Sequence, residues 1–200
     1  IELVEVPISE LIEEYHLADF GQGSEVADKA KAEFESHAPV ALQKYSEGAF
    51  KIYCALKSLI KRYELNGLTL RCFDLLDSLG NTGCLALAIL NAEGIPAGCE
   101  GDVPALVSMT IGSALTGVSG FQANPSRIDP QTGEILFAHC TVPLNMLRSY
   151  TFNTHFESGI GIAISGNIPV GDATVFKVSG DLSRYFCCSA DLLKCQKEGS

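Results

Sequence analysis

The apolar residues in the first 65 positions recur at helical spacing after one short opening strand. Residues 3–6 have the pattern of a strand, and the acidic run that follows predicts a short helix. Ser24 is a typical N-cap for a second helix. A third, longer helix is predicted from Pro39 to Asn66, because a single apolar stripe repeats every three or four residues. The stripe consists of Leu42, Tyr45, Ala49, Tyr53, Leu56, Ile60 and Tyr63.

Strands and helices then alternate as far as Thr116. Residues with high strand propensity at 68–73 and 95–99 predict two strands. The stretch 84–90 is apolar on every side, which predicts a buried helix, and a further helix is expected from 103 to about 115. Because such alternation is the signature of an α/β fold, we expect an α/β domain over residues 1–116.

Beyond Gly117 the helical periodicity ends. Short strand-like segments separated by Asn-Pro, Asp-Pro, Gly-Asn and Ser-Gly turns predict a β-rich domain over 117–200, built as an antiparallel sheet or a small barrel. The expected strands are 134–140, 150–156, 159–165, 172–178 and 182–188. Ligands favour the seam between such domains and the C-terminal ends of α/β strands, so candidate site residues are sought there.

Composition and charge restrict the class of protein. The 200-residue chain is 46% apolar and 19% charged, as is typical of a globular protein, and no apolar run is long enough to span a membrane. Its net charge of −10 has the wrong sign for a nucleic-acid partner. Eight cysteines without a C-x-x-C pair favour a reducing cytoplasm over a disulfide scaffold. The start at Ile1, without an initiator Met, predicts a fragment of a longer polypeptide or a processed chain.

Glu100 is the most informative position for chemistry. It ends a short apolar strand in a Gly-Cys-Glu-Gly-Asp turn, immediately before a predicted helix. A carboxylate there lies at the mouth of an α/β sheet, and the flanking glycines allow close backbone approach. Asp102, by contrast, is the natural N-cap of the helix that Pro104 helps to begin, so a purely structural role is expected to account for it.

Two histidines are candidate partners for Glu100. His139 shares a strand face with Ile135 and Phe137, where a lone histidine is more often a core residue than a ligand. His155 points away from the apolar face of its own strand, toward solvent or a cleft. A carboxylate–imidazole set suits a divalent ion such as Mn²⁺, Mg²⁺ or Zn²⁺. Cys99 and Cys140 each adjoin a candidate ligand, but without a chelating partner we expect both to be buried small hydrophobes.

The ordered set of motifs resembles the L-fucose isomerase-like family, within the superfamily of L-fucose and L-arabinose isomerases. The similarity covers essentially the whole chain, as the middle and C-terminal portions of a protein about twice as long. It is carried by the segments Leu70-Arg71-Cys72-Phe73, Gly83-Cys84-Leu85-Ala86-Leu87, Gly98-Cys99-Glu100-Gly101-Asp102, Phe121-Gln122-Ala123-Asn124-Pro125-Ser126, Ala138-His139-Cys140-Thr141, His155-Phe156-Glu157-Ser158-Gly159 and Gly171-Asp172-Ala173-Thr174.

This resemblance implies an intramolecular aldose–ketose isomerase that uses a divalent metal, commonly Mn²⁺, to bind adjacent sugar oxygens. Glu100 matches the glutamate that is both metal ligand and proton-transfer base. The second acidic ligand falls on Asn124, whose amide can coordinate but cannot act as a base. The metal-binding histidine corresponds to His139 or His155. We also expect sugar contacts from Asp102 and Arg127.

Three hypotheses follow, and the sequence leaves all of them open. The first is a cytoplasmic, metal-dependent sugar isomerase with a small-molecule sugar as partner, assembled as a homo-oligomer and completed by an N-terminal domain that is missing here. The second, motivated by Asn124, is a homologue that binds carbohydrate without isomerising it or with altered chemistry. The third is an oligomerisation module of the larger chain.

Overall fold

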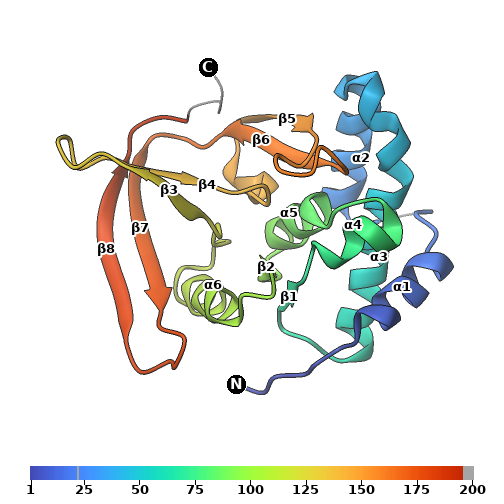
Figure 1. Ribbon diagram of the computed structural model, residues 1–200, viewed down its shortest axis with the longest axis horizontal. Helices are drawn as coiled ribbons and strands as arrows, with labels where there is room; N and C mark the ends of the chain where they lie inside the picture. The colour runs from blue at the N-terminus through green and yellow to red at the C-terminus, as the bar shows by residue number, and fades with distance from the viewer. Residues whose placement is uncertain (22, 196–200) are drawn as a thin grey trace.

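A computed structural model describes residues 1–21 and 23–195 and shows a mixed α/β fold (Figure 1). This confirms the predicted fold class. The elements are α1 (Ile8–Leu17), α2 (Glu25–His37), η1 (Val40–Leu42), α3 (Gln43–Arg62), β1 (Leu68–Leu70), α4 (Asp74–Leu79), α5 (Cys84–Ala92), β2 (Ala97–Cys99), α6 (Val103–Thr116), β3 (Asn124–Ile128), β4 (Ile135–Ala138), η2 (Leu144–Met146), β5 (Ser149–Asn153), β6 (Ala163–Asn167), β7 (Gly171–Val178) and β8 (Tyr185–Leu192).

The three N-terminal helices form where the apolar stripe and the cap predicted them. The hydroxyl of Ser24 accepts a hydrogen bond from the Ala27 N–H at 3.1 Å and so caps α2. The stripe of α3 faces the core, with Ala49 and Tyr53 among its buried members. The strand predicted at residues 3–6 is wrong: this segment has no regular structure and is largely exposed. None of the described strands pairs with it, so its backbone groups have no ladder to join.

The centre of the molecule is a short parallel pair of strands beside a buried helix. β1 and β2 pair in the register Leu68↔Ala97 and Leu70↔Cys99. Helix α5 is buried over nearly its whole length, as its uniform apolar sequence predicted. A disulfide joins Cys72, two residues beyond the end of β1, to Cys99, the last residue of β2. The expectation that Cys99 is a free buried thiol is therefore wrong, because the parallel pairing brings the two cysteines together.

The C-terminal part consists of antiparallel hairpins. β3 pairs with β4, β5 with β6 and β7 with β8, each as a separate two-stranded sheet, and the described residues contain no closed barrel. Strand β3 was not predicted, because its sequence Asn-Pro-Ser-Arg-Ile lacks an apolar–polar alternation and contains a proline. Helix α4, at only six residues, is too short to leave a helical period.

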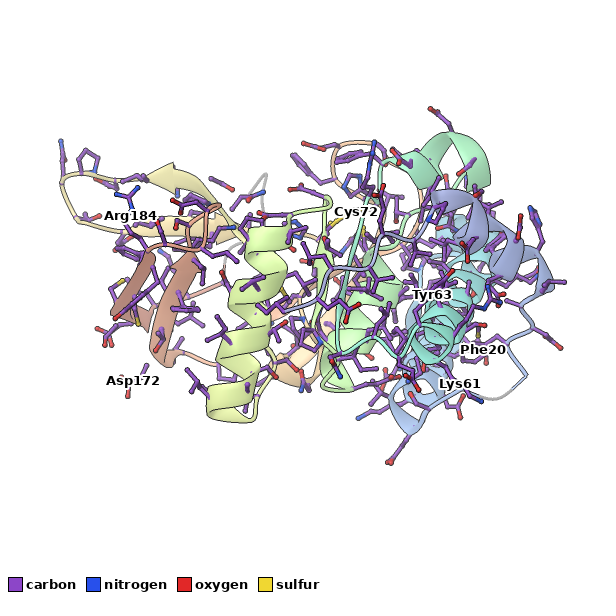
Figure 2. The ribbon with its side chains drawn as sticks, turned by 90° about the horizontal axis from the view of Figure 1, so that it is seen from below. Phe20, Lys61, Tyr63, Cys72, Asp172 and Arg184 are labelled. Carbon is purple, nitrogen blue, oxygen red and sulfur yellow. A yellow bond between two sulfur atoms is a disulfide. The ribbon has the colours of Figure 1, made fainter. Side chains whose placement is uncertain are left out.

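The hydrophobic core runs between the helical and hairpin regions. Phe34 of α2 meets Phe152 of β5 with ring centroids 4.9 Å apart, and Ile162 and Val142 belong to the same core cluster. Figure 2 shows α6 standing between the β7–β8 hairpin and the other helices. The division into domains at Thr116 stays a prediction. No helix in the described part of the chain is long and apolar enough to cross a membrane.

Candidate functional site

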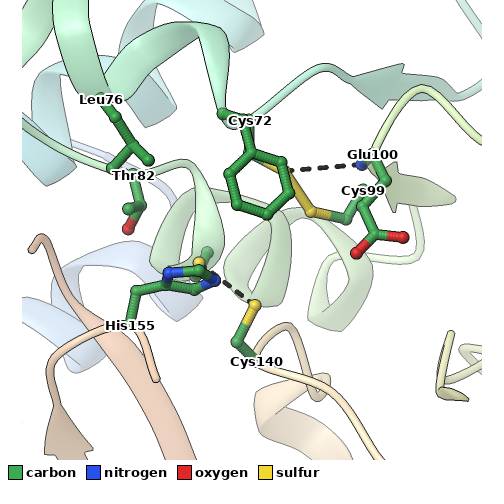
Figure 3. Close-up of a pocket in the computed structure, with 9 residues that line it drawn as sticks. Cys72, Leu76, Thr82, Cys99, Glu100, Cys140 and His155 are labelled. Carbon is green, nitrogen blue, oxygen red and sulfur yellow. Dashed lines mark hydrogen bonds between the residues drawn. A yellow bond between two sulfur atoms is a disulfide. The ribbon is translucent and has the colours of Figure 1, made fainter. Parts of the chain in front are cut away.

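Glu100 lies in the turn that joins β2 to α6, in an unusual backbone conformation. Its φ is +64°, in the left-handed region that a residue with a side chain rarely adopts. The Glu100 N–H lies 3.5 Å from Cys72 Sγ, so the disulfide adjoins this turn (Figure 3). The side chain is 41% exposed. The fold therefore holds a solvent-accessible carboxylate on a strained but anchored turn, a combination that is common at functional sites.

His139 faces this carboxylate from the strand end of β4. Its side chain is only 4% exposed, and its Nε2 lies 3.9 Å from Glu100 Oε1. On the other side of the ring, Nδ1 lies 2.9 Å from the hydroxyl of Thr141. Burial lowers the pKa of His139 below its ordinary value; nearby Glu100 opposes that shift and His155 adds to it. A neutral imidazole is thus favoured, with one nitrogen held by Thr141 and the other directed at Glu100.

This pair could supply two ligands to a divalent metal ion. The 3.9 Å gap between Nε2 and Oε1 is too long for a hydrogen bond. Two metal–ligand bonds of ~2.1 Å each span at most ~4.2 Å when collinear, so an ion could bridge these two atoms only at a wide angle. A neutral histidine whose second nitrogen is hydrogen-bonded is the usual form of a metal-binding imidazole. Glu100 and His139 could therefore hold such an ion between them.

His155 belongs to a second group, formed with two cysteines. One ligand atom each from Cys84, Cys140 and His155 lie within 4.8 Å of one another. The two sulfur atoms are 3.3 Å apart. Cys84 begins α5, Cys140 follows β4, and His155 follows β5, so three separate elements contribute (Figure 3). The expectation that Cys140 serves only as a small apolar side chain does not account for this arrangement.

The surroundings of the two thiols shift their pKa values in opposite directions. The hydrogen bond with Cys140 lowers the pKa of the Cys84 thiol despite its burial. The same contact and burial raise the pKa of the Cys140 thiol. Both groups adjoin a cavity of about 20 Å³, which is also lined by Cys72, Thr82 and Glu100. Such a volume admits a single water-sized species and excludes a sugar.

The remaining candidates lie outside this cluster. Asp102 caps α6, accepting from the Ala105 N–H at 2.7 Å, and also pairs with Lys177 at 3.0 Å, so its structural role is confirmed. Asn124 is exposed on β3, where the register places it opposite Ala138, the residue before His139. Arg127 is exposed on the same strand, beside a bulge. The structure thus brings Glu100 close to His139. Asn124 and Arg127 instead lie on the β3–β4 hairpin that precedes His139.

The sequence did not reveal Cys84 or Thr141 as site residues. Cys84 is 56 positions from Cys140, and no local spacing links them. Its position at the start of an apolar helix was the available signal, since thiols at helix N-termini are often functional. Thr141 could have been found from its place two residues after a candidate histidine.

Comparison with known proteins gives relatives but no family model that matches. A sulfoquinovose isomerase from Clostridium sp. (strain MSTE9) is 33% identical over 134 residues, which are 64% of this chain and 30% of that protein. Sulfoquinovose isomerases from Priestia aryabhattai and Priestia megaterium (strain ATCC 12872 / QMB1551) are each 28% identical over 130 residues, or 62% of this chain and 29% of theirs. The chain therefore spans less than a third of the length of these curated relatives.

Proposed function

We propose that this chain forms part of a metal-dependent aldose–ketose isomerase. The observation that carries the proposal is the 3.9 Å approach of the Glu100 carboxylate to the buried His139 imidazole. The similarity to sulfoquinovose isomerases supplies the reaction class. Sulfoquinovose is therefore the first substrate to test, followed by L-fucose and L-arabinose.

The chemistry requires a proton to move between two adjacent sugar carbons. Glu100 takes the proton from C2 of the open-chain aldose and returns it to C1, with an enediol between the two transfers. The proton of the C2 hydroxyl is transferred to the C1 carbonyl oxygen, so the sugar is isomerised without a net change in composition. A bound divalent ion, which we propose to be Mn²⁺, would supply polarisation of the sugar oxygens. From this chain, Glu100 and His139 would hold it.

The other predicted residues take supporting roles in this proposal. Asn124 could offer an amide oxygen from β3, and Arg127 and Asp102 could contact sugar hydroxyls. Because the cavity beside Glu100 is far smaller than a sugar, we infer that further parts of a longer chain or a second subunit complete the substrate site. We also propose that the protein is a homo-oligomer, that it is located in the cytoplasm and that it is related to the L-fucose isomerases.

The test is solvent-proton exchange into the sugar together with isomerisation, measured in D₂O with Mn²⁺ present. Glu100→Gln keeps the shape of the side chain but removes the base, so we expect both rates to fall by roughly 10²–10⁴-fold. Glu64→Gln is a matched control, because Glu64 also has a positive φ, of +51°, and is exposed elsewhere. It should leave both rates unchanged.

Two outcomes would contradict the proposal. If Glu100→Gln exchanges and isomerises as fast as the original protein, Glu100 is not the base. If the original protein binds sugar without exchanging any proton, the chain is a carbohydrate-binding homologue instead. Mn²⁺ affinity, measured on the same two variants, separates a loss of the ion from a loss of the base.

A further inference from the structure

The thiols of Cys84 and Cys140 meet His155 in a way that the proposed isomerase chemistry does not use. Their ligand atoms lie within 4.8 Å of one another, and the sulfur–sulfur distance is 3.3 Å. Cys84 is buried, and the other two are half-buried. Three side chains from three elements are therefore already gathered around one small cavity.

The imidazole of His155 is held in a fixed orientation. Its Nδ1 accepts a hydrogen bond from the Ser158 backbone N–H at 3.3 Å and lies 3.0 Å from Ser158 Oγ. Its ring meets the edge of Phe73 with centroids 5.8 Å apart.

Thr82 provides an independent sign that something is bound here. It is 3% exposed, it lines the same cavity, and its hydroxyl is buried without a hydrogen-bond partner in the described part of the chain. Figure 3 shows this hydroxyl directed toward His155. Buried polar atoms are almost always satisfied, and the Thr82 side chain also interacts with the Cys84 thiol, so a coordinated water beside that thiol would give this hydroxyl a full partner.

We propose that Cys84, Cys140 and His155 form a Zn²⁺ site, distinct from the Glu100–His139 pair. Two thiolates and one imidazole are a typical zinc ligand set, and a water facing Thr82 would complete four-coordination. Carboxylate-containing sets with harder ligands suit Mn²⁺ better. The thiolate–imidazole group would therefore prefer Zn²⁺, and the carboxylate–imidazole pair would prefer Mn²⁺. Binding converts two thiols to thiolates, so one Zn²⁺ enters as two protons leave and the charges cancel.

The test uses Co²⁺ as a spectroscopic substitute for Zn²⁺ in protein purified without oxygen, so that Cys84 and Cys140 remain thiols. We expect one Co²⁺ per chain with a sulfur-to-cobalt charge-transfer band, which Zn²⁺ abolishes on addition. Cys140→Ser and His155→Ala should each weaken Co²⁺ binding by more than ~100-fold and remove or shift the band. Thermal unfolding followed by circular dichroism establishes that each variant is folded.

Matched controls separate this site from other thiols and from the proposed catalytic site. Cys54→Ser alters a half-buried thiol of α3, and Cys187→Ser an exposed one of β8; both should keep the band. Glu100→Gln should also keep it, so failure of the isomerase proposal leaves this one intact. The zinc site is overturned if the original protein with free thiols takes up no Co²⁺. It is equally overturned if folded Cys140→Ser and His155→Ala variants retain the band.

Discussion

The hydroxyl of Thr141 helps to orient the imidazole of His139, which faces Glu100. Thr141 is 2% exposed, and its hydroxyl lies 2.9 Å from His139 Nδ1. If Nδ1–H donates to this oxygen, the lone pair on Nε2 is directed at the carboxylate. Outer partners of this kind fix both the tautomer and the ring angle of a metal-binding histidine.

Removal of this hydroxyl should weaken metal binding without unfolding the protein. Thr141→Val preserves shape but leaves Nδ1 unpaired, so we expect Mn²⁺ affinity to fall about 10- to 100-fold. Calorimetric titration with Mn²⁺ measures the change. Thr141→Ser, which restores a hydroxyl, should recover most of the affinity. Equal affinity in the valine variant would show that Thr141 does not position the ring.

At the residue scale, sequence reasoning found the groups whose place follows from local pattern. Glu100 and Asp102 lie in a turn between a strand and a helix, and such a turn is visible in the sequence. Thr82 and Cys84 are close in the sequence, but Cys140 reaches them only through tertiary packing, which no spacing encodes. Asn124 and Arg127 were assigned from resemblance, and the structure places them on a strand that was itself not predicted.

At the scale of elements, the disulfide between Cys72 and Cys99 fastens the ends of β1 and β2. These strands are only three residues each, so few ladder hydrogen bonds hold them together. The cross-link closes a loop with a sequence separation of 27. Such a link restricts the unfolded chain and keeps the Glu100 turn beside β1.

The double variant Cys72→Ala/Cys99→Ala should lower the free energy of unfolding by about 3–4 kcal/mol, as expected for a loop of this length. Urea denaturation measures it, with Cys54→Ala as the control for loss of a half-buried thiol. In denaturant without reductant, six of the eight cysteines should react with an alkylating reagent. Reaction of all eight would show that the disulfide does not form.

Elements with strong periodicity were predicted well, and short or unpaired ones were not. Helix α3 followed from one stripe, and α5 from an unbroken apolar run. Residues 3–6 have strand composition, but none of the described strands pairs with them, and strand propensity alone does not supply a partner. The boundaries of β1 and β2 were overestimated because apolar residues continue beyond the paired backbone.

At the scale of the whole molecule, the β7–β8 hairpin is attached through α6. Ser108 Oγ accepts from the buried Val178 N–H at 2.9 Å, and Lys177 pairs with Asp102 at 3.0 Å. Strand β8 is exposed along almost its whole length. How the hairpins would dock on the helices could not be predicted, because contacts between distant segments leave no periodic signal.

Ser108→Ala should therefore loosen the hairpin more than the rest of the protein. It leaves the Val178 N–H buried and unpaired, which costs about 1–3 kcal/mol locally. Hydrogen exchange should accelerate in β7 and β8 and stay unchanged in α3 and α5. Thr110→Val is the control, since Thr110, like Ser108, donates to a carbonyl one turn earlier in α6 but forms no hydrogen bond with β7 among the described residues. Uniform acceleration would indicate global destabilisation instead.

At position 100 the left-handed backbone makes a side chain costly for stability, whereas the proposed chemistry requires the glutamate side chain. Glycine would adopt a φ of +64° without steric cost, whereas glutamate pays about 1–2 kcal/mol for it. A Glu100→Gly protein should thus be the more stable polypeptide and, under the proposed function, the poorer isomerase. If variants were selected for thermal stability alone, glycine should replace Glu100. If they were selected for activity as well, the fraction that keep Glu100 would measure how strongly activity is favoured.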